Sequence, residues 1–244
     1  MHQQLANATF QVLAGSSCGS GFSFMRDNLV VTNFHVVKQL IDLKTKTAET
    51  PAIIETEFGK RMLAFVVKFD EENDFAIMRI PGKLPDGRTV LQASTNFVLQ
   101  RGARVIFAGY PHGVPQLLTN EGIVSAPLND GRFVIDGMVN GGNSGGPIID
   151  ARTGEAIGIV TQRRFILGGQ SRALNEEATR LRSYLSRIPS GSVGIIGIDF
   201  GQFADLLGRS LQLVTTMLES NANSGIGTGF SLIPVVAAIN ELPA

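Results

Sequence analysis

Short segments of β-prone residues, separated by turn residues, follow one another from Thr9 to Gln162. A chain that turns so often favours an antiparallel β fold over a helical bundle. The content of 28 Gly with only 17% charged residues agrees with a turn-rich β protein. The strands expected first are 9–14, 19–25, 29–32, 52–57, 61–69 and 74–80. A second set is expected from about residue 98, at 104–108, 116–126, 132–136, 147–150 and 156–162.

A Pro- and Gly-rich connector at residues 81–88 separates the two sets. Two sets of about six short strands predict a mainly β fold of two six-stranded antiparallel β-barrels. The predicted domains are residues 1–90 and residues 91–244. Neither barrel closes over the motifs described below, so we expect these motifs to meet in a cleft between the barrels.

Beyond Arg163 the pattern becomes helical. Residues 171–188 carry an apolar stripe at helical spacing, and Pro189 ends it. Asp199 is a plausible N-cap for a second helix, whose apolar stripe runs from Phe203 to Leu218. The fold therefore includes a helical segment near the C-terminus.

The chemistry centres on a glycine-rich segment around one serine, Gly142-Asn143-Ser144-Gly145-Gly146-Pro147. Such a segment can aim backbone N–H groups at the oxyanion that forms when a serine attacks a carbonyl. A plain glycine turn before a strand is the alternative. A serine nucleophile also needs a histidine base. Of the three histidines, His2 lies in a terminus expected to fray and His112 in an exposed loop, which leaves His35, directly after a strand.

Three segments together resemble trypsin-like serine proteases, and the HtrA (high-temperature-requirement) type in particular. Thr32-Asn33-Phe34-His35-Val36-Val37 resembles the family's histidine segment. Asn73-Asp74-Phe75-Ala76 resembles its aspartate segment, and the Ser144 segment resembles its nucleophile segment. Their order of His, Asp and Ser is that of chymotrypsin-type enzymes. The resemblance implies a catalytic triad of His35, Asp74 and Ser144.

The same resemblance implies an oxyanion hole made by the backbone N–H groups of Gly142 and Ser144. It places Thr161 beside Asp74 and in the substrate pocket, and Val139 in the specificity pocket. Because Val139 is apolar and residues 137–142 include no acid, cleavage after small or medium aliphatic residues is expected. Asn143 replaces the aspartate of zymogen-type relatives, so activation by N-terminal cleavage is not expected.

Residues 225–233 resemble the family's last barrel strand, and residues 234–242 resemble its terminal helix. Residues 163–223 then form a helical insertion. In a rival register, residues 193–207 supply the last strand and helix. Since the chain ends soon afterwards, the PDZ domain common in HtrA proteins is not expected.

Several broad properties bound the function. Lys+Arg 21 balances Asp+Glu 21, which gives no reason to expect nucleic-acid or membrane binding. Cys18 is the single cysteine, and we read it as a small buried residue. With no basic signal sequence apparent, a cytoplasmic location is expected.

The sequence thus predicts a serine endopeptidase acting on proteins or peptides, without a cofactor or metal. A second copy or a regulatory partner could bind the helical insertion. The alternatives are a catalytically silent binding or scaffold protein on a protease fold, and another acyl-transfer hydrolase such as an esterase.

Overall fold

The computed structural model of the chain describes residues 1–94, 98–163, 169–187, 194–195, 198–221 and 225–243. The chain divides into two compact units, of which the first comprises Met1–Arg164 with Gly225–Ala244 and the second Phe165–Ser224.

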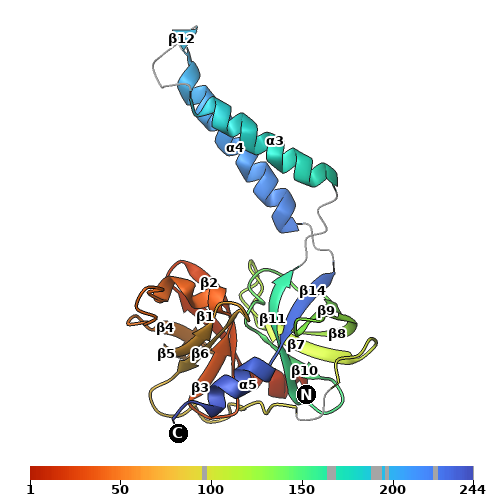
Figure 1. The fold of residues 1–244 in the computed structure, drawn as a ribbon. Helices are drawn as coiled ribbons and strands as arrows, with labels where there is room; N and C mark the ends of the chain where they lie inside the picture. Colours follow the sequence, from red (N-terminus) through yellow and green to blue (C-terminus); the bar gives the residue numbers. More distant parts are fainter. Residues whose placement is uncertain (95–97, 164–168, 188–193, 196–197, 222–224, 244) are drawn as a thin grey trace. The chain divides into compact units, whose positions relative to one another are not determined.

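The first unit contains two closed, six-stranded antiparallel barrels, which confirms the predicted fold class (Figure 1). The first barrel has the strand order β1-β2-β3-β6-β5-β4 and the second the order β10-β11-β14-β9-β8-β7. The strands of the first barrel are β1 Thr9–Ala14, β2 Ser17–Ser23, β3 Leu29–Thr32, β4 Ala52–Glu55, β5 Arg61–Asp70 and β6 Phe75–Arg79. Those of the second are β7 Arg104–Gly109, β8 Leu118–Pro127, β9 Arg132–Asp136, β10 Pro147–Asp150, β11 Ala156–Arg163 and β14 Ile226–Ser231.

Each barrel is filled by the inward-facing side chains of its strands. Phe10, Ile54 and Met78 lie in the core of the first barrel, and Phe107 and Phe133 lie in that of the second. A third apolar cluster is drawn from strands of both barrels and from the helices α1 His2–Ala8 and α5 Ile233–Asn240. This shared cluster holds the two barrels together, because its burial removes apolar surface of both from water.

The two terminal helices pack on the barrels. Leu5 and Ala8 of α1 are fully buried, so the expectation of a frayed N-terminus was wrong. The Arg26 guanidinium, from the first barrel, donates hydrogen bonds to the carbonyl oxygens of Ile239 and Leu242 at the end of α5. A cation at this place satisfies carbonyls that the helix leaves without partners.

Strand β14 decides between the two registers proposed for the end of the chain. It pairs with β11 on one side and with β9 on the other, and so closes the second barrel. The rival register was wrong, because β12 (Gly194–Ile195) pairs with β13 (Ile198–Asp199) in a small separate sheet.

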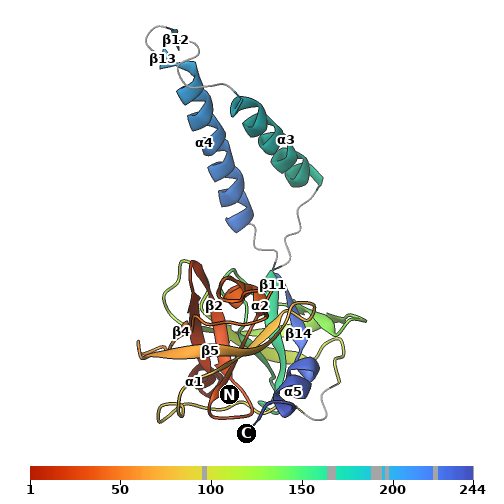
Figure 2. The ribbon, with the colours of Figure 1, turned by 60° about the vertical axis from the view of Figure 1, so that its left-hand side comes forward.

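The second unit contains the helices α3 (Gly169–Leu185) and α4 (Phe200–Asn221) (Figure 2). Asp199 is the predicted N-cap, and its Oδ1 accepts hydrogen bonds from the N–H groups of Gly201 and Gln202. Helix α4 buries small residues, namely Gly201, Ala204 and Gly208. Six of its large apolar residues are exposed, and these are Phe200, Phe203, Leu206, Leu207, Leu213 and Val214.

Candidate active site

The first barrel brings His35 and Asp74 together at neighbouring strand ends. His35 lies in a short helix, α2 (Phe34–Val37), immediately after β3, and Asp74 lies immediately before β6. Strands β3 and β6 are antiparallel partners with Thr32 opposite Ala76, so the end of one strand adjoins the start of the other. A 3-10 turn at Lys38–Leu40 follows α2 directly.

Asp74 is held in an unusual backbone conformation. Its φ is 47°, in the left-handed region that few residues other than glycine occupy. The Asn33 side-chain amide donates to the Asp74 carbonyl oxygen at 2.7 Å, and the His35 backbone N–H donates to Asp74 Oδ1 at 3.1 Å. These two bonds fix the backbone and the carboxylate of Asp74 beside the imidazole.

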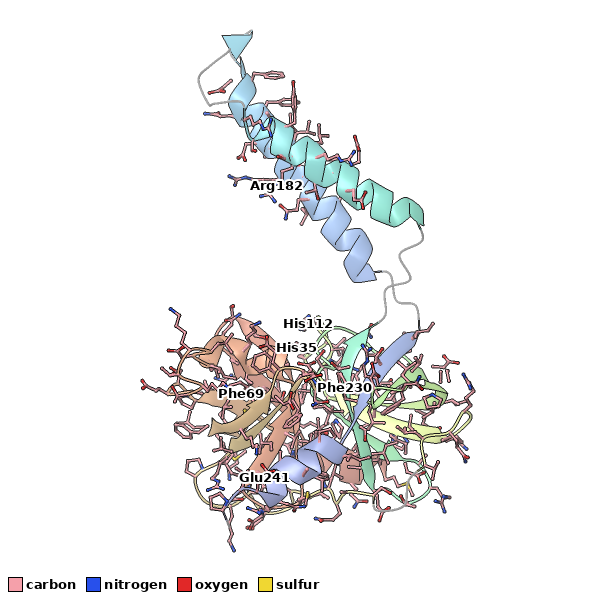
Figure 3. The ribbon with its side chains drawn as sticks, viewed as in Figure 1. His35, Phe69, His112, Arg182, Phe230 and Glu241 are labelled. Atoms are coloured by element: carbon pink, nitrogen blue, oxygen red, sulfur yellow. The ribbon has the colours of Figure 1, made fainter. Side chains whose placement is uncertain are left out.

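The His35 imidazole is oriented by this carboxylate. Its Nδ1 lies 2.8 Å from Asp74 Oδ2 and 3.0 Å from Asp74 Oδ1. A carboxylate accepts hydrogen bonds, so Nδ1 carries the proton and Nε2 of the neutral ring is left as the basic nitrogen. The His35 side chain is 46% exposed, whereas that of Asp74 is 17% exposed. The basic nitrogen therefore belongs to a ring that solvent and a substrate can reach (Figure 3).

Thr161, from strand β11 of the second barrel, connects the pair to the Ser144 segment. Its buried hydroxyl donates to Asp74 Oδ2 at 2.6 Å, and its carbonyl oxygen accepts a 2.9 Å hydrogen bond from the Ser144 hydroxyl. One threonine thus contacts both the carboxylate and the serine. Within the described residues, no hydrogen bond joins Ser144 to His35.

Among the backbone N–H groups of the Ser144 turn that have no protein acceptor within the described part of the chain, two are those predicted to form the oxyanion hole. These are the N–H groups of Gly142 and Ser144. The Gly141 carbonyl oxygen accepts from His112 N at 2.7 Å, and the Asn143 carbonyl oxygen accepts from Gly146 N at 2.9 Å. These two carbonyl groups belong to the same peptides as the N–H groups of Gly142 and Ser144. The hydrogen bonds to the carbonyl oxygens therefore orient the two N–H groups that are predicted to form the oxyanion hole.

Val139 packs inside the second barrel. It is 1% exposed and belongs to the core cluster of Phe107, Phe133 and Ile148. It lies against Gly227 of β14, where an added Cβ would come within 2.3 Å of Val139 Cγ2. A glycine at this place lets the valine approach the strand.

A cavity of about 440 Å³ adjoins His35 and draws its walls from both barrels. Its lining residues are Phe34, His35, Lys38, Glu71, Glu72, Asp74, Arg132, Thr161, Thr228 and Phe230. Three of these charged side chains are in ion pairs away from His35, because Lys38 contacts Glu71 at 3.4 Å and Arg132 pairs with Asp130. A chain segment bound beside His35 would meet apolar and charged groups together.

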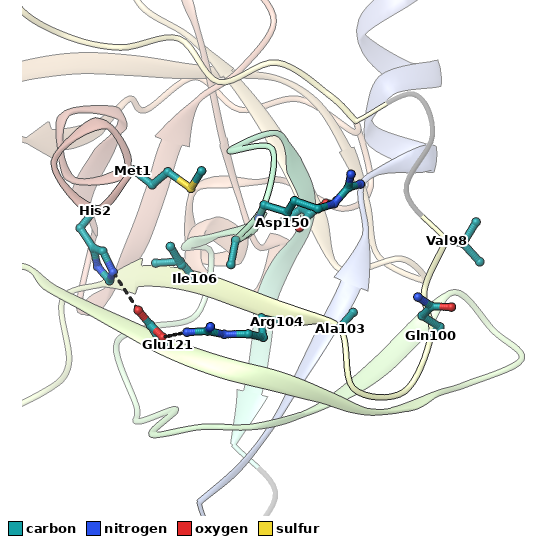
Figure 4. A pocket seen from close by; sticks show the side chains of 11 residues that line it. Met1, His2, Val98, Gln100, Ala103, Arg104, Ile106, Glu121 and Asp150 are labelled. Atoms are coloured by element: carbon teal, nitrogen blue, oxygen red, sulfur yellow. Dashed lines mark hydrogen bonds and ion pairs between the residues drawn. The ribbon is translucent and has the colours of Figure 1, made fainter.

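A larger cavity of about 820 Å³ includes none of the predicted site residues. It lies where α1 meets β7 and β8, and His2, Glu121 and Arg104 form a row of polar contacts along its wall (Figure 4). Its Asp150 carboxylate also has a cationic neighbour, Arg152, at 3.7 Å. Because these charges contact one another, this cavity offers less to a charged ligand than its composition suggests.

His112 and Cys18 have local contacts that the sequence did not indicate. His112 is exposed, as expected, yet its Nε2 lies 3.4 Å from the Cys18 carbonyl oxygen. Cys18 is half-buried and not fully buried as expected. Burial raises the pKa of the Cys18 thiol by more than a hydrogen bond from Gln11 lowers it. The neutral thiol that results is a poor nucleophile.

Sequence reasoning missed Ser20, a fully buried serine of β2 that contacts the turn around Ser144. The available signal was its place in Gly19-Ser20-Gly21, since glycines within a strand often mark a close approach of another backbone. Added Cβ atoms at Gly19 and Gly21 would meet neighbouring atoms at 2.7 Å and 2.9 Å.

The described residues contain no group of three or more His, Cys, Asp and Glu side chains placed to hold a metal ion. Within the same residues, none of the helices combines the length and the apolar character needed to span a bilayer.

A family model for the trypsin-like peptidase domain matches residues 19–159, more than half of the 244-residue chain. The chain belongs to the trypsin-like peptidase family. This trypsin-like peptidase is 29% identical over 198 residues to "Serine protease HTRA1" of Xenopus tropicalis, covering 70% of this chain and 40% of the relative. It is 32% identical over 182 residues to "Serine protease HTRA4" of Mus musculus, covering 70% and 34%.

A third relative, "Protease Do-like 1, chloroplastic" of Arabidopsis thaliana, is 32% identical over 155 residues, covering 59% of this chain and 32% of its own. The chain thus spans between 32% and 40% of the length of these relatives. Among solved structures, the inactive form of Rv3671c protease aligns with a TM-score of 0.54 at 23% identity, covering 68% of this chain and 81% of the other. The crystal structure of Deg5 aligns with a TM-score of 0.53 at 24% identity, covering 66% and 81%.

Proposed function

We propose that this trypsin-like peptidase is a serine endopeptidase with Ser144 as nucleophile, His35 as general base and Asp74 as the group that orients His35. The observation that carries the proposal is the continuous set of hydrogen bonds that runs from His35 through Asp74 to Thr161 and on to Ser144. A base oriented by a carboxylate, beside a half-buried serine, is the arrangement that acyl transfer requires.

The proposed reaction begins when the Ser144 hydroxyl turns from the Thr161 carbonyl toward His35 Nε2. Catalytic hydrogen bonds often form only when substrate binds, so the ligand-free orientation is compatible with this step. Ser144 Oγ then attacks the scissile carbonyl carbon while His35 takes the hydroxyl proton. The Asp74 carboxylate stabilises the imidazolium without itself becoming protonated.

The tetrahedral intermediate carries its negative charge on the former carbonyl oxygen. In the proposal, this oxyanion accepts hydrogen bonds from the Gly142 and Ser144 N–H groups, which make none within the described protein. His35 returns the proton to the leaving amine, and the peptide bond breaks to give an acyl-enzyme on Ser144. A water molecule, deprotonated by His35, then hydrolyses the ester and restores the hydroxyl.

A catalytically silent scaffold is less well supported, because such a protein has no need to keep a base, an orienting carboxylate and unpaired N–H groups in one place. Labelling with a serine-directed fluorophosphonate probe distinguishes a serine peptidase from a catalytically silent scaffold. Wild type should be labelled and should cleave peptides, whereas Ser144→Ala and His35→Ala should lose nearly all peptidase activity. The double variant should be no worse than either single variant, because triad members act as a unit. A Ser144→Ala protein that keeps its turnover would refute the mechanism.

We propose cleavage after small or medium aliphatic residues. The support is the absence of an acid in residues 137–142, which leaves no partner there for a cationic side chain. A peptide library read by mass spectrometry tests this specificity. Dominant cleavage after Arg or Lys would contradict it, while cleavage of esters alone, with peptides left intact, would favour an esterase.

The helical unit is the proposed contact for a partner. The large apolar side chains exposed on α4 support binding to another protein surface, either a second copy of the chain or a regulatory protein. The proposed substrates are proteins or peptides, and the proposed location is the cytoplasm.

A further inference from the structure

Every polar group of the buried serine Ser20 makes a hydrogen bond, and most of these bonds reach residues of the second barrel. Its hydroxyl donates to the Gly142 carbonyl oxygen at 2.7 Å and accepts from the Tyr110 N–H at 2.9 Å. Its backbone N–H donates to the Ser144 carbonyl oxygen at 2.8 Å. Its own carbonyl oxygen accepts from the Thr32 hydroxyl at 2.7 Å. Ser20 is therefore bonded on both sides of Asn143, within the turn that carries the nucleophile.

These bonds fix consecutive peptide planes of the turn. In a trans peptide, the carbonyl and the following N–H point in opposite directions. His112 N holds the Gly141 carbonyl, so the Gly142 N–H points away from His112. The Ser20 hydroxyl holds the next carbonyl, that of Gly142. The N–H of that same peptide, from Asn143, donates to the Asn140 carbonyl oxygen at 3.1 Å. Gly142 joins the two planes with a φ of 93°, and because glycine has no Cβ to restrict it, the hydrogen bonds of the planes set its conformation.

The surroundings of Ser20 leave no room for the turn to relax. An added Cβ at Gly145 would lie 2.1 Å from the Ser20 carbonyl oxygen, and one at Gly109 would lie 2.9 Å from the Ser20 hydroxyl oxygen. Ser20 is 0% exposed, so water cannot replace a lost hydroxyl without a rearrangement. The Gly142 carbonyl would then lose its hydroxyl partner in the interior, which is unfavourable.

We infer that Ser20, from the first barrel, is a positioning residue that holds the Gly142 N–H of the second barrel in the orientation that binds the oxyanion. The inference rests on the proposed serine peptidase function. It also gives the two barrels a joint role in the oxyanion hole, since the hydroxyl comes from β2 and the N–H groups come from the turn between β9 and β10.

The test compares Ser20→Ala with Ser23→Ala. Ser23 lies on the same strand, is equally buried, and donates to the carbonyl oxygens of Ala8 and Thr89, which lie outside the site. Removing one oxyanion donor costs about 100-fold to 1000-fold in kcat, and Ser20 acts one bond away from such a donor. We expect Ser20→Ala to lower kcat by about 10-fold to 100-fold with KM within about threefold of wild type.

Two further measurements separate positioning from a loss of folding. A peptidyl boronic acid, which forms a tetrahedral adduct on the serine, should bind Ser20→Ala more weakly by a similar factor. A product peptide that forms no adduct should bind both variants alike. Circular dichroism should show the folded state of each variant at the assay temperature.

If Ser20→Ala does not fold, Ser20→Cys takes its place, because a thiol keeps a similar shape but is a weak donor. It should lower kcat more than Ser23→Cys does. The inference is overturned if the folded Ser20 variants keep the kcat and boronate affinity of their Ser23 counterparts. A wild type that cleaves no peptide and takes no fluorophosphonate would instead refute the proposed function.

Discussion

The hydroxyl of Thr161 provides a direct test of how the second barrel supports the base of the first. It donates to Asp74 Oδ2 at 2.6 Å, and Thr161 is 2% exposed. Thr161→Val removes this hydroxyl while keeping the β-branched shape that suits a strand. The Thr161 carbonyl, which accepts from Ser144, is unaffected by the substitution. The change is therefore confined to one of the hydrogen bonds of the Asp74 carboxylate.

The size of the effect follows from the bonds that remain. Asp74 keeps its contacts with the His35 backbone N–H and with His35 Nδ1, so the imidazole stays in place. A hydrogen bond to a charged group contributes about 1.5–3 kcal/mol. If part of that energy, about 1.4–2.7 kcal/mol, is lost in the transition state, kcat/KM falls about 10-fold to 100-fold. This is milder than the loss expected for Asp74→Asn, which would favour the wrong imidazole tautomer.

The assay is steady-state hydrolysis of a fluorogenic peptide with an aliphatic residue before the scissile bond, together with thermal unfolding. Thr9→Val is the matched control, because Thr9 is a fully buried strand threonine whose hydroxyl donates to the Leu5 carbonyl oxygen at 2.8 Å, away from the site. The control should stay within about threefold of wild type in kcat/KM. Wild-type kcat/KM in Thr161→Val, or an equal loss in both variants, would show that the hydroxyl does not support the carboxylate.

Gly145→Ala should prevent folding or abolish activity, because the added Cβ would lie 2.1 Å from the Ser20 carbonyl oxygen. Gly131→Ala is the control, since Gly131 has a φ of 78° but open space around it. It should lower the free energy of unfolding in urea by only about 1–2 kcal/mol. Burial raises the pKa of Asp70, but hydrogen bonds from Asn73 and Glu72 together lower it by more than burial raises it. The pKa of Asp70 is therefore below its usual value. The stability that Asp70 contributes is full above the unfolded pKa of about 3.9 and is lost as pH falls through the lower folded pKa. Asp70→Asn should therefore destabilise the protein at neutral pH and much less in acid; equal losses at both would contradict this. Replacing residues 163–223 with a short Gly/Ser linker should alter peptide kinetics, and unchanged kinetics in a folded product would show that the helical unit has no part in catalysis.

The parts of the fold that the sequence predicted well have local causes. Strand 147–150 follows from an apolar run between turn residues, and the cap at Asp199 follows from one side chain at a helix start. Helix α1 was missed because its few apolar residues form no convincing stripe, and its stability depends on burying Leu5 against the barrels. The domain boundary near residue 90 stays a prediction.

The site was only partly predictable for a related reason. Motifs indicated His35, Asp74 and Ser144, but no local pattern links Ser20 to Gly142, which lie 122 positions apart in the chain. The resting hydrogen bond from Ser144 to Thr161 is a choice between side-chain rotamers, and a motif does not encode such a choice. Likewise, the apolar stripe of α4 indicated a helix, but it did not indicate that glycine and alanine would be its buried side.

The position of β14 in the second barrel has a consequence for synthesis on the ribosome. This strand lies between β9 and β11, yet it is translated about 60 residues after β11, at a rate of roughly 5–20 residues per second. For several seconds the nascent barrel has two open edges, which are liable to pair with other chains. The wall that Thr228 and Phe230 contribute beside His35 is missing for the same interval. A nascent chain therefore carries the proposed nucleophile, Ser144, before the cavity beside His35 is complete.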